Sequence, residues 1–373
     1  MAVAMGVGRF AYTPLLPLME EGAGISHRMA GLIGSANLAG YLVGAFSASN
    51  AVFRVRRLTF AWVAIGVVIA TTALMAVTPV SSWMVVRFVT GAGSGFAFVL
   101  ASSILLDRAA REKRPDWIAI FYGGVGAGIV LTAIAVPILG AWGGWREGWL
   151  GLALISTVLC AVTLPSLTDS ANAETAQIKD ATAHPYPALF GWLAAAYGAQ
   201  GMGYVIPATF LVAMVAGTPA IARYAALSWI VVGVVAIPST IIWNRLGIAI
   251  GRDVALVIAL CVMAIGAIAP VVATNAFGVI VAAATLGGTF IGVTALTTAL
   301  GRTLRPQQSH VAIGQLTAAF GVGQILGPAV AGVLISDYES YTPALVVSTG
   351  VLSLSAIVMA CGAILARVRR RAA

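Results

Sequence analysis

The sequence predicts an all-α integral membrane protein with twelve transmembrane helices, arranged as two parallel six-helix pseudo-repeats. Three observations support this prediction: the composition, the regular spacing of apolar runs, and similarity between the two halves at one fixed offset. Hydrophobic residues make up 60% of the chain and charged residues only 9%, whereas a soluble protein carries about 25% charged residues. This small number of charged side chains cannot cover a water-facing surface. We therefore expect the chain to lie in a lipid bilayer.

Apolar runs of about 20 residues, the length that crosses the hydrocarbon core of a bilayer, follow one another along the whole chain. They cover residues 1–19, 29–50, 58–78, 82–106, 117–142, 148–167, 187–214, 223–244, 252–273, 276–301, 311–336 and 343–366. The first run lacks the charged start and cleavage site of a secretory signal, so we expect it to be a retained span. It is about two turns shorter than the seventh run, which starts near Pro187. This difference predicts that the natural chain starts upstream of Met1.

The basic residues indicate the orientation of the helices. Most of the 21 lysine and arginine residues lie in the loops after the even-numbered spans and in the C-terminal tail. By the positive-inside rule these loops are cytoplasmic. The sequence therefore predicts a multi-pass protein of a bacterial-type inner (plasma) membrane with both termini in the cytoplasm. The net charge of +9 is an orientation signal, and we expect no nucleic-acid partner.

The two halves of the sequence resemble each other at an offset of 195 residues. The segment AMGVGRFAYTPLLPLM, residues 4–19, aligns with AQGMGYVIPATFLVAM, residues 199–214, so Gly6 and Gly8 match Gly201 and Gly203. The same offset takes Arg28 to Arg223 on the following span. We therefore expect an N-terminal half over 1–167 and a C-terminal half over 187–373. The polar residues 168–186 between them have the composition of a cytoplasmic linker.

Three short motifs carry a resemblance to a known family. Arg87 is followed by Gly91 and Gly93 in the fourth span, Asn244-Arg245-Leu246-Gly247 follows the eighth span, and Gly323 to Pro328 form GQILGP in the eleventh. These motifs, together with two parallel six-helix halves, resemble the major facilitator superfamily. The segments GVGRFAYTPLLPLM and GMGYVIPATFL are similar to its YbfB/YjiJ-type branch. The resemblance implies a monomeric secondary transporter that moves a small molecule by alternating access.

Arg9 is the leading candidate for a substrate contact. It lies about 15 Å from the end of its helix, near the middle of a hydrocarbon core about 30 Å thick. A charge at that depth is a functional-site hypothesis by default. Tyr12 and Thr13 follow on the same helical face, and Tyr204 occupies the equivalent position in the seventh span. The alternative is a structural cation, capped by backbone carbonyls that Pro14 and Pro17 leave free.

Further polar residues at helical spacing are candidates for the wall of a central cavity. They are Tyr197 and Gln200 on the seventh span, Asn37 and Tyr41 on the second, Thr285 and Thr289 on the tenth, and Arg87 on the fourth. For Arg87 the alternative is a side chain that reaches back to the membrane surface. Gln315 and Gln324 lie on opposite faces of their helix, so at most one of them faces the cavity.

A second group of residues is expected to serve helix packing and conformational change, because small residues let helix backbones approach closely in membranes. The group comprises Gly6, Gly8, Gly91, Gly93, Gly201, Gly203, Gly323, Gly327, Pro328 and Arg245.

The sequence offers no catalytic set and no metal cluster, so we expect neither an enzyme nor a cofactor. Cys160, Cys261 and Cys361 lie within apolar runs without metal-binding spacing. All acidic residues fall in loops or at helix ends, so no buried carboxylate is available to carry a proton. We therefore predict a carrier of a small organic anion, coupled to protons or to a counter-anion. The alternatives are an efflux transporter of drugs or amphiphiles by proton antiport, and a receptor that transports nothing.

Overall fold

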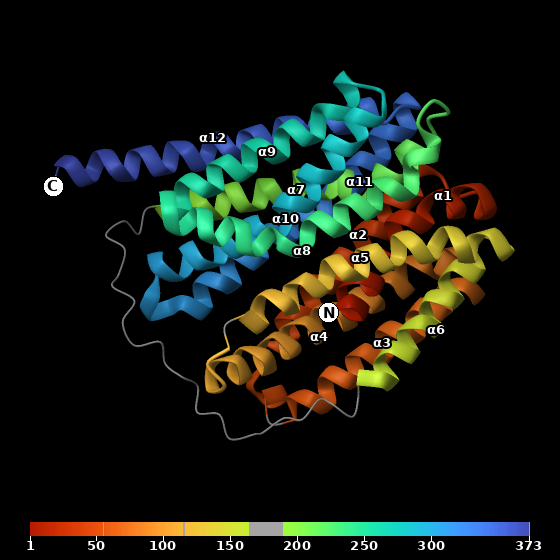
Figure 1. The fold of residues 1–373 in the computed structure, drawn as a ribbon, viewed down its shortest axis with the longest axis horizontal. Helices are drawn as coiled ribbons and strands as arrows, with labels where there is room; N and C mark the ends of the chain where they lie inside the picture. Colours follow the sequence, from red (N-terminus) through yellow and green to blue (C-terminus); the bar gives the residue numbers. More distant parts are fainter. Residues whose placement is uncertain (55, 115, 164–188, 373) are drawn as a thin grey trace.

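The computed structural model describes residues 1–54, 56–114, 116–163 and 189–372, and this part of the chain is helical without any strand. The expected linker, 168–186, and the start of the seventh span near Pro187 lie outside the described residues. The long helices run as one elongated bundle (Figure 1). Their bounds are α2 (His27–Ala48), α3 (Arg57–Val77), α4 (Trp83–Arg111), α5 (Asp116–Gly143), α6 (Trp145–Thr163), α7 (Leu189–Ala216), α8 (Ala225–Ile250), α9 (Arg252–Val272), α10 (Ala276–Leu304), α11 (Ser309–Tyr338) and α12 (Thr342–Ala372).

These 11 helices are long and apolar enough to cross a membrane. The first span is built differently, because it consists of a π-helix, η1 (Ala2–Phe10), that continues through Ala11 into α1 (Tyr12–Ala23). Neither piece alone has the length of a span, but together they provide the twelfth crossing that the sequence predicts. Short 3-10 turns, η2 (Ala51–Arg54), η3 (Val80–Ser82), η5 (Ala222–Tyr224) and η6 (Pro306–Gln308), lie between the longer helices.

Helix ends follow local sequence rules in most places. The Ser26 side chain caps α2 by accepting a hydrogen bond from the Met29 backbone, and Asn275 caps α10 in the same way. The eighth span differs from the expectation. It continues to Ile250, so Arg245 lies on the helix and is exposed there rather than in a loop. The turn comes at Gly251, whose φ of +97° favours glycine.

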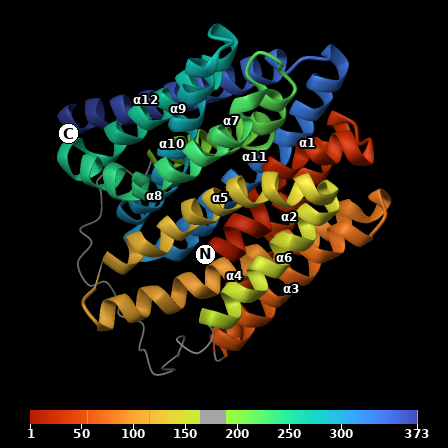
Figure 2. The same ribbon diagram turned by 45° about the vertical axis from the view of Figure 1, so that its right-hand side comes forward.

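The helices form two groups, α1 to α6 and α7 to α12, that pack side by side (Figure 2). Within the first group α2 packs on α4, and α3 packs on α4 and α6; in the second group α8 packs on α10, and α9 packs on α10 and α12. Between the groups, α2 packs on α11 and α8 packs on α5. Each contact is the image of another under the sequence repeat, so the fold has the pseudo-two-fold symmetry of two parallel repeats.

Glycines lie where helix backbones come closest. A Cβ on Gly6 would lie 2.5 Å from the Cα of Gly128 on α5, and a Cβ on Gly91 would overlap the backbone of α2 at Asn37. The expected packing glycines Gly8, Gly93, Gly201, Gly203, Gly323 and Gly327 also lie against neighbouring helices. Large side chains at these positions would not fit without movement of the neighbouring helix or of its side chains.

The two groups meet firmly at the end of the bundle that carries the α1–α2 turn, on the right in Figure 1. Gly31 on α2 lies directly against the Pro328 carbonyl of α11, and the Arg28 backbone N–H donates to Ser336 Oγ at 3.0 Å. The His27 ring also meets Tyr341 of the second group, with ring centroids 5.5 Å apart. The bundle is therefore closed between the groups at this end.

Candidate functional site

The site begins with a contact between two equivalent positions of the repeat. Arg9 on η1 donates from Nη2 to the Tyr204 hydroxyl of α7 at 2.6 Å, and the two residues are 195 positions apart. Thr13 donates to the Ala208 carbonyl, also at an offset of 195. Equivalent residues touch each other only when both lie next to the symmetry axis. This contact therefore places Arg9 in the centre of the bundle, between the two groups.

The Arg9 guanidinium is surrounded by neutral partners. Its central carbon lies 5.2 Å from the Phe10 ring centroid and 5.0 Å from that of Tyr41, which is within the range of cation–π attraction. Tyr204 also accepts a hydrogen bond from the Gln324 amide of α11. None of the ion pairs described in the structure includes Arg9, although only 9% of its surface is exposed. A buried cation of this kind favours binding of an anion.

Arg87 has a different environment. It is only 1% exposed, so it does not reach the membrane surface. Its two terminal nitrogens donate to the carbonyls of Gly8 at 3.2 Å and Arg9 at 3.4 Å. Pro14 has no N–H to donate to the Arg9 carbonyl one π-helical turn earlier, so that carbonyl needs a donor from elsewhere. Arg87 is therefore the arginine that bonds to free backbone carbonyls, which was the structural alternative for Arg9.

We expect Arg87→Gln to destabilise the protein, because it removes two charge-assisted hydrogen bonds that hold η1 on α4. The loss should be about 1.5–3 kcal/mol of unfolding free energy, measured as a lower Tm in mild detergent. An unchanged Tm combined with lost transport would contradict this role and would return Arg87 to the group of substrate contacts.

A small void of about 30 Å³, here called the polar void, is lined by both arginines together with polar and apolar side chains. Its walls come from both groups: Arg9, Tyr12, Thr13, Asn37 and Arg87 from the first, with Val205, Ala208 and Thr209 from the second. The Arg87 Nε atom is buried and has no hydrogen-bond partner. The void has the volume of a water molecule or of one small polar group, and two positive charges adjoin it.

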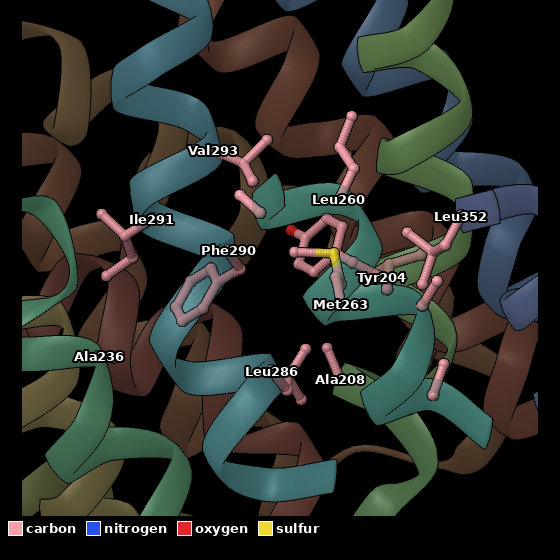
Figure 3. Packing of buried hydrophobic residues seen from close by; sticks show 14 of the residues in the cluster. Tyr204, Ala208, Ala236, Leu260, Met263, Leu286, Phe290, Ile291, Val293 and Leu352 are labelled. Carbon is pink, nitrogen blue, oxygen red and sulfur yellow. The ribbon is translucent and has the colours of Figure 1, made fainter. Parts of the chain in front are cut away.

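An apolar space lies beside the polar one and shares Phe10 and Ala208 with it. It is lined by aromatic and aliphatic side chains, including Tyr204, Trp229 and Phe290, and is too narrow for a water molecule in this conformation. Figure 3 shows Phe290 of α10 and Tyr204 of α7 on opposite sides of this space, with Leu286 and Ala208 beside them. Polar and aromatic walls thus meet at the centre of the bundle.

Seven of the predicted site residues come together here: Arg9, Tyr12, Thr13, Asn37, Tyr41, Arg87 and Tyr204. The other four make their contacts with neighbouring helices or within their own helix. Thr285 lies against Gly266 of α9, and its hydroxyl bonds to its own helix at Val281. Thr289 bonds to the Thr285 carbonyl. Gln200 approaches the Met263 sulfur, and the Tyr197 hydroxyl bonds to Thr294.

The structure decides between the two glutamines and adds aromatic residues to the site. Gln324 is 1% exposed and bonds to Tyr204, whereas Gln315 lies at the helix end and accepts from Arg305. This agrees with the expectation that only one of the two glutamines faces inward. Phe10 and Phe290 were missed because an aromatic residue in an apolar span carries no pattern that separates a binding wall from ordinary packing.

Comparison with known proteins decides the family. Residues 1–360 match a family described as "Uncharacterised MFS-type transporter YbfB". The chain belongs to this family of the major facilitator superfamily (MFS). It is therefore a multi-pass membrane transporter and not an enzyme, and its substrate is a small molecule. A search of curated proteins gives no significant match.

Solved MFS transporters share the fold. The chain is similar to a mutant form of the nucleoside transporter NupG, with a TM-score of 0.73, 15% identity, and coverage of 97% of this chain and 98% of that one. It is similar to the xylose transporter XylE from E. coli in a partially occluded inward open conformation, with a TM-score of 0.72, 15% identity, and coverage of 96% and 94%. A bacterial homolog of the human lysosomal transporter Spinster, inward-facing and occupied, gives a TM-score of 0.68, 15% identity, and coverage of 99% and 94%. At this identity the likeness shows the fold alone.

Proposed function

We propose that this YbfB-type transporter carries a small organic anion, a carboxylate, with Arg9 as its main contact. The observation that carries the proposal is the environment of Arg9: a buried guanidinium between the two groups, bonded to a neutral tyrosine and adjoining a polar void. A guanidinium binds a carboxylate through two parallel hydrogen bonds. The low dielectric of the bundle strengthens the attraction, which for unit charges 4 Å apart is about 4 kcal/mol at an effective dielectric of 20.

The transport cycle follows from the position of the site. Both the polar void and Arg9 lie between the two groups of helices. Rocking of these two groups would open the site first at one end of the bundle and then at the other. The contacts of Gly31 and Arg28 close the α1–α2 end in the present conformation.

Transport can be coupled to a proton or to a second anion through the substrate anion itself. The described carboxylates lie at helix ends, where Asp107 pairs with Arg57 and Asp253 pairs with Arg367 at 2.7 Å. We propose that the substrate either brings its own proton or exchanges for another anion, so that no buried acid is required.

Transport into proteoliposomes tests the function. Purified protein is reconstituted as a monomer and assayed with radiolabelled organic carboxylates and, in parallel, with a lipophilic cation. We expect saturable uptake of a carboxylate that excess unlabelled carboxylate inhibits. Carriage of the cation without any carboxylate uptake would support amphiphile efflux instead.

The proposed orientation has its own test. The loops rich in lysine and arginine lie at the α2–α3 end of the bundle, and such loops are usually cytoplasmic. We therefore place this end and both termini in the cytoplasm of a bacterial-type cell. A reporter fused after Ala373 or inserted near Gln177 should report cytoplasm, and one inserted near Ala23 or Glu339 should report the outside. A cytoplasmic result at Glu339 would contradict the orientation.

A further inference from the structure

The two spaces beside Arg9 differ in chemistry and lie next to each other. Arg9 and Arg87 line the polar void, whereas Phe10, Trp229 and Phe290 line the apolar space. Phe10 and Ala208 form part of both walls. A ligand that filled both spaces would have a compact charged end and a flat apolar body.

Aromatic rings make up much of the wall of the apolar space. Phe10 meets Phe290 edge-on with centroids 5.7 Å apart and lies 6.3 Å from Trp229 at an angle of 54°. Tyr204 and Phe290 are nearly parallel, with an angle of 7° and centroids 6.1 Å apart. Aromatic rings prefer edge-to-face and offset-parallel partners, so once the space widens, a wall of this composition favours another aromatic ring over an aliphatic chain.

Trp229 adds a buried hydrogen-bond donor to the wall of the apolar space. Its side chain is completely buried, and its indole N–H has no hydrogen-bond partner. A buried donor without a partner costs free energy, which a ligand acceptor would recover. Because Trp229 forms part of the wall of the apolar space, that acceptor would lie on the apolar body of the ligand.

We propose that the substrate is a planar aromatic carboxylate with a hydrogen-bond acceptor on its ring. The carboxylate lies on Arg9 in the polar void, and the ring lies among Phe10, Trp229 and Phe290. This inference rests on the proposed function, because it takes Arg9 as the carboxylate contact. Phe10 and Ile129 come from the first group, and the remaining wall comes from the second. Separation of the two groups would therefore widen the space to admit the ring.

Four ligands test the inference with the purified full chain: benzoate, cyclohexanecarboxylate, benzamide and pyridine-3-carboxylate. Affinities are measured by titration calorimetry in mild detergent. We expect benzoate to bind about tenfold more tightly than cyclohexanecarboxylate, which has the same charge and similar size. Neutral benzamide should not bind measurably. Pyridine-3-carboxylate, which carries a ring acceptor, should bind more tightly than benzoate.

Three variants and one control identify the residues that contact the ligand. Phe290→Leu should bring the affinities for benzoate and cyclohexanecarboxylate within about twofold of each other, and Phe10→Leu should do the same if Phe290→Leu does not fold. Phe277→Leu is the matched control, because Phe277 lies on the same helix with 71% of its surface exposed. Trp229→Phe keeps a ring but removes the N–H, so it should abolish the advantage of pyridine-3-carboxylate over benzoate.

The outcomes that contradict the inference are distinct. Equal binding of benzoate and cyclohexanecarboxylate to the wild type would overturn the aromatic substrate and leave the carboxylate carrier standing. An undiminished advantage of pyridine-3-carboxylate in Trp229→Phe would overturn the acceptor contact. Binding of benzamide as tight as that of benzoate would refute the proposed function itself.

Discussion

We expect Arg9→Gln to abolish carboxylate transport while the protein remains folded. Glutamine keeps some hydrogen-bonding capacity toward Tyr204 but removes the positive charge and the two parallel donors that bind a carboxylate. Arg9→Lys keeps the charge and loses the planar fork, so its affinity should fall about tenfold, corresponding to about 1.4 kcal/mol. Uptake by proteoliposomes and Tm in detergent measure the two effects separately.

The control for Arg9 is Arg146→Gln, which removes one positive charge from the α1–α2 end, where Arg146 lies exposed over the Trp145 ring. Its transport should match that of the wild type. Carboxylate uptake by Arg9→Gln at the wild-type rate would rule out Arg9 as the main contact. If its Tm instead fell as far as that of Arg87→Gln, the role of Arg9 would be structural.

We expect Gly31→Val to stop the transport cycle by preventing closure at the α1–α2 end. A Cβ at this position would overlap the Pro328 carbonyl oxygen of the second group, which is a backbone atom of a helix. Overpacking of a close contact costs about 1–3 kcal/mol, which shifts an equilibrium between two conformations by about fivefold to 150-fold. The transport rate of Gly31→Val should therefore fall at least about fivefold, and that of Gly31→Ala should fall as well.

Accessibility of Ser35 reports the conformational change. Ser35 is 7% exposed and bonds to the Ile325 carbonyl across the two groups at 2.7 Å. In a protein without its native cysteines, a cysteine at position 35 should react faster with an impermeant thiol reagent when Gly31→Val is present. Gly350→Val is the matched control, because a Cβ there meets no atom within 4 Å. Unaltered labelling and transport in Gly31→Val would exclude closure at this contact as a step of the cycle.

Local sequence features were sufficient for much of the fold. Apolar runs longer than about 18 residues predict helices in a membrane wherever they occur, because every backbone polar group must be bonded within its own segment. The offset of 195 residues likewise predicted that Arg9 and Tyr204 are equivalent. The sequence patterns missed the extent of α8, because they do not show how far a helix continues past its last apolar turn.

Composition, span length and the repeat are properties of the chain alone, and they determined the fold class, the twelve crossings and the place of Arg9 among them. The tertiary structure decided which faces meet. It brought Arg9 onto Tyr204, placed Arg87 against the carbonyls of η1, and turned Thr285 toward α9. The rotation of each helix depends on close contacts between small residues of different helices, such as Gly6 with Gly128. Such contacts join residues far apart in the chain, so no local pattern in the sequence specifies them.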